Sequence, residues 1–196
     1  TQKVLAIPYD MPIPGYKNNR INTLRLWKAE ANDDFDLAEF NEGDYAEAVA
    51  TKNLAEQITM VLYPNDASVN GKELRLKQQY FLSSASLQDL LIRYVNKFGE
   101  DFSHFSELNV MQLNDTHPSI AVPELMRLLL DQYGLSWDAA WAITSQSMAY
   151  TNHTLLPEAL ERWSVPMMKN MLPRIVEIIF EINARYLELV AHHWPG

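Results

Sequence analysis

Two short apolar segments that each end in a cluster of polar residues constrain the fold of this chain most. Residues 109–113 and 148–151 are the segments, and we expect a strand at the first. The polar residues that follow are Asn114, Asp115, Thr116 and His117 after the first segment, and Asn152, His153 and Thr154 after the second. Ligands of open α/β sheets bind outside the carboxyl ends of strands. The pattern therefore predicts a sheet whose edge presents these side chains.

The remaining elements are predicted from apolar spacing. Alternation predicts strands at 4–9 and 22–29 that pair or neighbour each other, with the prolines and glycine of 10–16 ending the first. A spacing of three and four predicts helices at 45–62, 72–98, 123–133, 137–148 and 165–190. Their apolar stripes should form the core, and they include Leu62 in the first helix and Ile175, Ile178, Tyr186 and Leu189 in the last. Pro173 should break the last helix, Gly99 and Gly134 should end two others, and Ser136 should cap a fourth. The fold class predicted is α/β, rich in helix with short strands.

Composition limits the classes of function. With 196 residues, 47% of them hydrophobic, the chain can form one domain or one piece of a larger domain. It contains no cysteine, which excludes disulfides and thiolate metal sites and is typical of a cytoplasmic protein. A net charge of −9 argues against binding nucleic acid or an anionic membrane surface. No apolar run approaches the roughly 20 residues that span a bilayer.

The polar clusters favour a ligand rich in hydroxyl groups. Asn, Asp and His side chains donate or accept hydrogen bonds in fixed directions, which is how a neutral sugar can be held. Asn65 and Asp66, together with Arg75, could form a third cluster. The residues alone therefore indicate carbohydrate as the ligand.

Two other readings of the same residues stay open at this point. Asn, Asp and Thr before a helix are common cap and turn residues, so residues 113–119 could be only a strand-to-helix turn. Asp115, His117 and His153 are residue types that bind metals, although they lack the spacing of known motifs, and we expect no metal. A serine hydrolase is not indicated, because the chain has no G-x-S-x-G.

Four longer stretches carry a resemblance to a known family. They are PYDMPIPGYKNNRINTLRLW at 8–27, LYPNDASVNGKELRLKQQYF at 62–81, QLNDTHPSIAVPELMRLLLD at 112–131 and AYTNHTLLPEALERW at 149–163. Together they resemble the glycogen/maltodextrin phosphorylases, α-glucan phosphorylases that depend on pyridoxal phosphate. Members are several times longer and have two Rossmann-like domains of the glycosyltransferase-B type. The resemblance implies that residues 1–196 are part of the N-terminal, glucosyl-binding domain.

The resemblance also implies an activity for the longer protein. Inorganic phosphate would cleave the terminal α-1,4-linked glucose of glycogen or maltodextrin and release α-glucose 1-phosphate. Pyridoxal phosphate would be bound by a lysine of a C-terminal domain, so residues 1–196 alone should be inactive. A homodimer would form through the helix Tyr45 to Leu62, in a cytoplasmic enzyme. The alternative is a non-catalytic glucan-binding module derived from the same domain.

The family's site residues can be matched to positions in this chain. His153 resembles the histidine that meets the glucosyl unit near its 6-hydroxyl, and Thr154 is its neighbour. Asp115 and His117 match residues that line the sugar side of the catalytic cleft. We expect these four residues in the catalytic site, with Asn114 binding substrate beside them.

Two further substrate-binding residues are expected in a loop that gates the site. Asp66 matches the family's acidic loop residue, and Arg75 matches the arginine that follows the loop. Ala67 departs from the Asn that many members carry after that Asp, which weakens a ligand contact at this position. This chain has Ile92 followed by Arg93 at the place where nucleotide-regulated members of the family carry a pair of arginines. Activation by AMP is therefore not expected.

Overall fold

The computed structural model describes residues 3–32, 45–156 and 160–194, with side chains for all of these except 45–49 and 51. The acidic stretch 32–44, where the sequence predicts a loop with a short helix at most, lies outside the described residues except for Asn32. The chain divides into two compact units, Thr1–Ala85 and Ser86–Gly196, and each is described by itself. Helix α3, Val69–Phe98, begins in the first unit and ends in the second.

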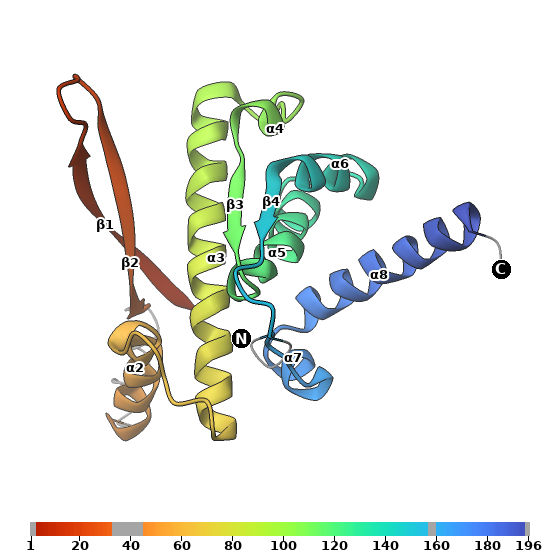
Figure 1. Cartoon of the computed structure of the whole chain (residues 1–196). Coiled ribbons are helices and arrows are strands. Elements are labelled where there is room, and N and C mark those ends of the chain that lie inside the picture. The colour runs from red at the N-terminus through yellow and green to blue at the C-terminus, as the bar shows by residue number, and fades with distance from the viewer. Residues whose placement is uncertain (1–2, 33–44, 157–159, 195–196) are drawn as a thin grey trace. The chain divides into compact units, whose positions relative to one another are not determined.

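An antiparallel hairpin begins the first unit (Figure 1). Strands β1, Val4–Pro14, and β2, Ile21–Ala31, pair along their full length, which confirms the predicted pairing. The expected end of β1 at Tyr9 is wrong, because the strand continues through Pro12 and Pro14. Gly15 donates its backbone N–H to Arg20 O at 2.9 Å, so nitrogens at odd positions face β2. The prolines stand at even positions, where an N–H would point away from the partner strand, and they therefore interrupt no hydrogen bond.

Helix α2, Tyr45–Met60, packs against β2 and completes the core of the first unit. That core consists of Ala29, Ile58 and Phe81 with the partly buried Val4, Ala6 and Trp27. The Gln78 side-chain amide donates to the carbonyl oxygens of Ile58 at 3.0 Å and Val61 at 2.8 Å, which satisfies groups at the end of α2. Leu62 was expected in the apolar stripe of this helix, but it lies beyond the helix end and is fully exposed.

The second unit contains two adjacent parallel strands with helices between and after them. Its elements after α3 are α4, Phe105–Leu108; β3, Met111–Asn114; the 3-10 helix η1, His117–Ile120; α5, Ala121–Arg127; the π-helix η2, Leu128–Gln132; α6, Trp137–Ser147; β4, Met148–Thr151; α7, Val165–Met171; and α8, Pro173–His193. Parallel neighbours require a crossover connection, which residues 115–147 supply here (Figure 1). The mixed helix and strand confirms the α/β class.

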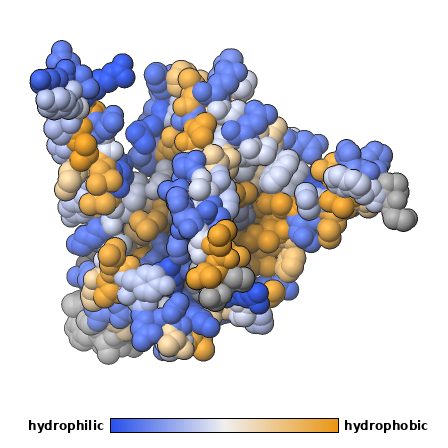
Figure 2. Space-filling model, in the orientation of Figure 1, coloured by the Kyte–Doolittle hydropathy of each residue, from blue (hydrophilic) through white to orange (hydrophobic). Residues whose placement is uncertain are grey.

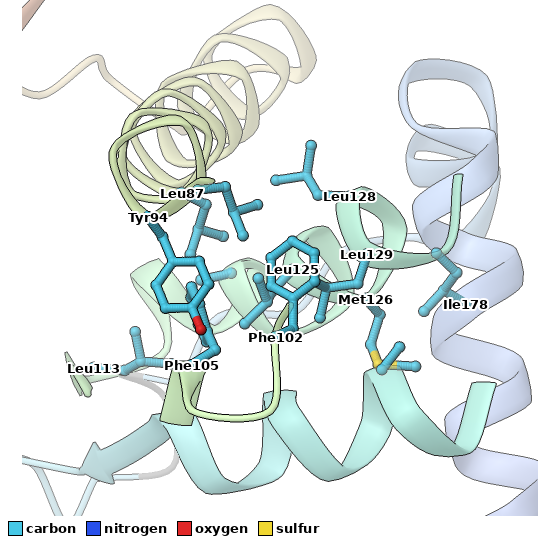
Figure 3. Close-up of a cluster of buried hydrophobic side chains, with 13 residues drawn as sticks. Leu87, Tyr94, Phe102, Phe105, Leu113, Leu125, Met126, Leu128, Leu129 and Ile178 are labelled. Atoms are coloured by element: carbon cyan, nitrogen blue, oxygen red, sulfur yellow. The ribbon is translucent and has the colours of Figure 1, made fainter. Parts of the chain in front are cut away.

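Buried aromatic and aliphatic side chains hold this unit together (Figure 3). Tyr94 of α3 packs edge-on against Phe105, with ring centroids 5.0 Å apart, and stacks on Phe102 with centroids 5.6 Å apart. Leu125 and Leu129 are fully buried beside them. Burying a side chain of this size contributes roughly 1.5–3 kcal/mol. Leu113 of β3 belongs to the same cluster, so the core fixes the strand that leads into the first polar cluster.

Predicted helix boundaries at glycine, serine and proline are confirmed. Gly99 and Gly134 adopt positive φ values of 74° and 67° at the expected helix ends, a conformation that glycine adopts without steric cost. The Ser136 hydroxyl accepts from Ala139 N at 3.3 Å and caps α6. Pro173 separates α7 from α8.

Part of the apolar surface of helix α8 is not covered by the rest of the second unit. Ile175 and Ile178 are buried, as the stripe predicts, whereas Tyr186 and Leu189 of the same stripe are 62% and 54% exposed. Apolar surface follows this helix in the space-filling view (Figure 2). Among the described residues, no helix is both long and apolar enough to cross a membrane.

Candidate functional site

The carboxyl ends of β3 and β4 lie side by side and deliver both polar clusters to one edge. The register pairs Leu113 with Tyr150 and Asn114 with Thr151. Leu113 is buried, and its strand neighbours on the opposite face, Gln112 and Asn114, are exposed. This alternation is the period of a strand with one covered face, and it points Asn114 out of the core at the edge where we expected the site.

Asp115 turns the chain away from β3 and reaches across to the second loop. Its φ of 63° lies in the left-handed region, which Asp and Asn tolerate better than other non-glycine residues. Its backbone N–H donates to Thr151 O at 2.9 Å, one residue beyond the end of the strand pairing. Its carboxylate oxygen Oδ1 accepts from the backbone N–H of His153 at 2.8 Å. Asp115 therefore holds the two strand-end loops together through both its main chain and its side chain.

His153 is held at a second point by Asn114. The ring nitrogen Nε2 lies 3.2 Å from Asn114 Oδ1. The structure thus brings together three of the residues predicted from sequence, Asn114, Asp115 and His153, which we call the strand-end site.

Further hydrogen bonds shape the second loop and join the two strands next to the strand-end site. Asn152 Oδ1 accepts from Thr154 N at 3.2 Å, and Thr154 Oγ1 accepts from Leu156 N at 3.2 Å. The Gln112 side-chain amide donates to Thr151 Oγ1 at 2.9 Å and links the two strands just before the loops. Thr154 is therefore a turn residue next to the site as well as a candidate ligand contact. Gln112 was not predicted, because an exposed glutamine in a strand carries no local signal.

His117 lies at the start of η1, away from the hydrogen bonds of the strand-end site. The Nε2 atom of His117 is 4.0 Å from Glu161 Oε1, and the His117 side chain is about half exposed. Glu161 is another residue that the sequence analysis did not single out, because only the fold brings it near His117. Over the described ranges, no three carboxylates or imidazoles gather to hold a metal ion, so the metal reading of Asp115, His117 and His153 has no geometric support.

The chemistry of the strand-end site suits hydroxyl groups. An amide, a carboxylate and an imidazole offer neutral donors and acceptors together with one negative charge. The side chains that the structure gathers here include neither Lys nor Arg. A phosphate group of pyridoxal phosphate or of a substrate would meet a carboxylate here, so this set does not fit a phosphate.

The other two predicted residues, Asp66 and Arg75, belong to the first unit. Asp66 is exposed in the loop 61–68 between α2 and α3, and Arg75 is buried in the second turn of α3, only 7% exposed. The Arg75 guanidinium lies 3.8 Å from the ring centroid of Tyr63, a cation–π contact. The sequence analysis did not single out Tyr63, because it lies in a loop and Arg75 lies in a helix, so no helical or strand periodicity relates the two residues.

The 61–68 loop folds back closely onto the start of α3. Asn65 Oδ1 accepts from Ala67 N at 3.0 Å, and Ser68 Oγ accepts from Gly71 N at 3.1 Å as an N-cap does. A Cβ at Gly71 would lie 1.8 Å from the carbonyl oxygen of Asn65. Only glycine therefore permits this approach of the loop to the helix.

A separate hollow of about 400 Å³ lies beside α6 in the second unit. Its walls include Phe102, Leu135 and Ile143, with Ser106 and Gln146 among the polar lining residues. It contains none of the residues predicted for the site.

Comparisons with known proteins place the whole chain in one family. The sequence profile of the family described as carbohydrate phosphorylase matches residues 1–196. Similar proteins include the muscle form of glycogen phosphorylase from Mus musculus at 56% identity, the brain form from Homo sapiens at 56% and the muscle form from Oryctolagus cuniculus at 55%. Each alignment covers 100% of this chain and 24% of the relative, so the chain spans about a quarter of the length of the curated relatives it matches. On this match over its full length, the chain belongs to the carbohydrate phosphorylase family.

Proposed function

We propose that residues 1–196 supply the sugar-binding edge of an α-glucan phosphorylase. The longer protein would use inorganic phosphate to release α-glucose 1-phosphate from glycogen or maltodextrin. The observation that carries this proposal is the strand-end site, where Asp115 and Asn114 hold His153 at the edge of a parallel sheet in a member of this family. The hydroxyl-binding chemistry of these residues fits a glucosyl unit.

Each residue of the proposed site has a role that its contacts support. Asp115 fixes the backbone of His153, whose exposed ring is available to a sugar hydroxyl. Thr154 and His117 would line the sugar pocket beside it, and Glu161 would orient His117. Because the strand-end site does not fit a phosphate, substrate phosphate and the cofactor would be held elsewhere, by the C-terminal domain that the family resemblance implies. Pyridoxal phosphate would supply there the phosphate group that handles a proton during the reaction.

The 61–68 loop is proposed to control access to the catalytic site. Asp66 stands exposed on it, and the contact between Arg75 and Tyr63 ties the start of the loop to α3. A surface loop with few contacts to its helix can move while the helix stays in place, which is the arrangement a gate requires.

A homodimer is proposed to form through the exposed face of α2. The buried face of this helix already packs within the first unit through Ala55 and Ile58. Leu54 and Met60 lie on the other side, each exposed although apolar, with Gln57 between them. Replacing Leu54 and Met60 together with Glu should convert the dimer into a monomer, as measured by light scattering after size-exclusion chromatography. An unchanged mass would exclude this face.

The test of the proposed activity uses the protein expressed from the complete gene. Maltodextrin and phosphate should yield glucose 1-phosphate, and the His153→Ala variant should lose most of this activity while keeping the thermal stability of the wild type. A product that binds maltodextrin in calorimetry but forms no glucose 1-phosphate would instead support the alternative, a non-catalytic glucan-binding module. A product that does neither would exclude both.

A further inference from the structure

We propose that Asn114 is a positioning residue, which holds His153 as the tautomer protonated on Nε2 and so leaves Nδ1 as a hydrogen-bond acceptor for a ligand hydroxyl. The second half of this statement rests on the proposed function, which assigns a sugar to His153. The first half concerns the imidazole alone.

The geometry of the pair determines which ring nitrogen of His153 carries the proton. Asn114 presents its carbonyl oxygen Oδ1 to Nε2 at 3.2 Å, and an amide oxygen can only accept. Nε2 must therefore be the donor. In a neutral imidazole the other nitrogen then carries a lone pair, because the ring holds a single N–H proton.

The ring needs this partner because the core does not hold it. Both Asn114 and His153 are exposed, so packing alone does not fix the rotation of the imidazole. Asp115 restrains only the backbone of His153, through the 2.8 Å hydrogen bond from its N–H. The side chain of Asn114 adds the second restraint, which fixes the ring plane as well as the tautomer.

The fold explains why Asn114 can reach the ring. Asn114 is the last residue of β3 and lies opposite Thr151, two residues before His153. The positive φ of Asp115 then sends the chain away, so that consecutive side chains contact the backbone and the ring of the same histidine. Asn114 thus acts through His153, whereas the sequence suggested that it binds substrate directly.

A spectroscopic experiment tests the tautomer. The protein from the complete gene is labelled with ¹⁵N-histidine, and two-bond nitrogen–proton correlations of the ring are recorded at about pH 8, where an ordinary imidazole is neutral. The His153→Gln variant identifies the signals of His153. We expect the pattern of a ring protonated on Nε2 in the wild type, a mixture of both tautomers in Asn114→Leu, and the wild-type pattern in Asn114→Asp, which keeps an acceptor oxygen.

Controls separate this effect from misfolding. Asn183→Leu, at an exposed position of α8, should leave the His153 signals unchanged. The signals of the other histidines, including His104, His117, His192 and His193, should stay in place in Asn114→Leu, which shows that the fold is kept. A wild-type ring protonated on Nδ1, or an Asn114→Leu variant whose His153 signals match the wild type, would overturn the proposal.

Kinetics then test the consequence for the ligand. Loss of one oriented hydrogen bond should lower kcat/KM about tenfold in Asn114→Leu, with most of the activity recovered in Asn114→Asp. If Asn114→Leu shows the mixed tautomers but keeps full activity, the positioning role is wrong. If the protein shows no phosphorolysis at all, the proposed function fails, and the tautomer spectra still decide whether Asn114 sets the proton of His153.

Discussion

The strand-end site and the 61–68 loop carry polar residues of similar type but are held in different ways. In the strand-end site, the hydrogen bonds join residues 38 and 39 positions apart, and they tie together the loops after two parallel strands, of which β3 is anchored in the core by Leu113. In the 61–68 loop, the hydrogen bonds made by the Asn65 and Ser68 side chains join residues two and three positions apart, and Gln78 reaches only Val61 at the start of the loop. Long-range contacts to a packed core fix a geometry before a ligand arrives, whereas local contacts let a loop move as one piece. The first arrangement suits positioning of a sugar, and the second suits gating.

The largest effect is expected from breaking the carboxylate link in the strand-end site. Asp115→Ala removes the acceptor of the His153 N–H and places a residue poorly suited to positive φ in the turn. Because a displacement of about 1 Å can cost roughly 100-fold in rate, we expect kcat/KM for maltodextrin phosphorolysis to fall about 100-fold. Asp115→Asn, which keeps an acceptor oxygen and tolerates the backbone conformation, should retain more activity.

A matched control for this change is Asp138→Asn, at a carboxylate that is 91% exposed on α6. It should behave as the wild type. If Asp115→Ala were as active as this control, the long-range link would be unnecessary, and the contrast between the two regions would not explain function.

A smaller effect is expected from forcing the 61–68 loop away from α3. In Gly71→Ala, the new methyl group would lie 1.8 Å from the Asn65 carbonyl oxygen, so the loop must shift. Such a clash costs about 1–3 kcal/mol. We expect a lower melting temperature and roughly tenfold lower kcat/KM, measured by calorimetry and by the phosphorolysis assay.

The control for the glycine change is Asn70→Ala, at the exposed neighbouring residue. It should change kcat/KM by less than about twofold and the melting temperature by less than about one degree. Equal effects of the two substitutions would mean that the close approach at Gly71 is not what fixes the loop.

A still smaller effect is expected from the aromatic contact of Arg75. Tyr63→Ala removes a cation–π contact of about 0.5–1 kcal/mol, which should raise KM for maltodextrin by a few fold if the loop closes over the ligand. Tyr63→Phe keeps the ring and should keep KM. A phenylalanine variant as weak as the alanine variant would assign the effect to the hydroxyl instead of the ring.

What the sequence could predict follows from the range of the forces involved. The longer helices, the helix ends at Gly99 and Gly134, and the placement of both polar clusters after short strands were predictable, because each depends on neighbours in the chain. The four-residue helix α4 was not predicted. The continuation of β1 through Pro12 was not, since it depends on which edge of the strand faces its partner.

The pairing of residues within the site was also beyond prediction. The contact of Asn114 with His153 depends on the register of two strands that are distant in sequence. Likewise, an apolar stripe shows which side of a helix is hydrophobic but not what covers it, which is why Tyr186 and Leu189 were expected in the core and are exposed. The α/β class was accessible from the chain, whereas the contacts that set the chemistry required the fold.

The smallest effect tests whether sequence separation alone makes a contact important. Arg174 forms two hydrogen bonds with Asp131, 43 positions away, at 2.7 and 2.9 Å, but the two side chains are 47% and 36% exposed. The hydrogen bonds from Arg174 lower the pKa of the Asp131 carboxyl below its usual value near 3.8. A carboxyl whose pKa is lower in the folded state stabilises the protein above pH 3.8, and this contribution is lost as the pH falls through the folded-state pKa.

Solvent screening limits this pair to less than about 1 kcal/mol. Asp131→Asn should therefore lower the free energy of unfolding slightly at about pH 6 and not at about pH 2, as measured by urea denaturation at both values, and should leave kcat/KM unchanged. If Asp131→Asn instead reduced activity as strongly as Asp115→Ala, separation along the chain would matter more than attachment to a strand that Leu113 anchors in the core. We expect the opposite, because the contacts of Asp115 are made from a strand end anchored by Leu113 in the core, whereas those of Asp131 are made at the surface.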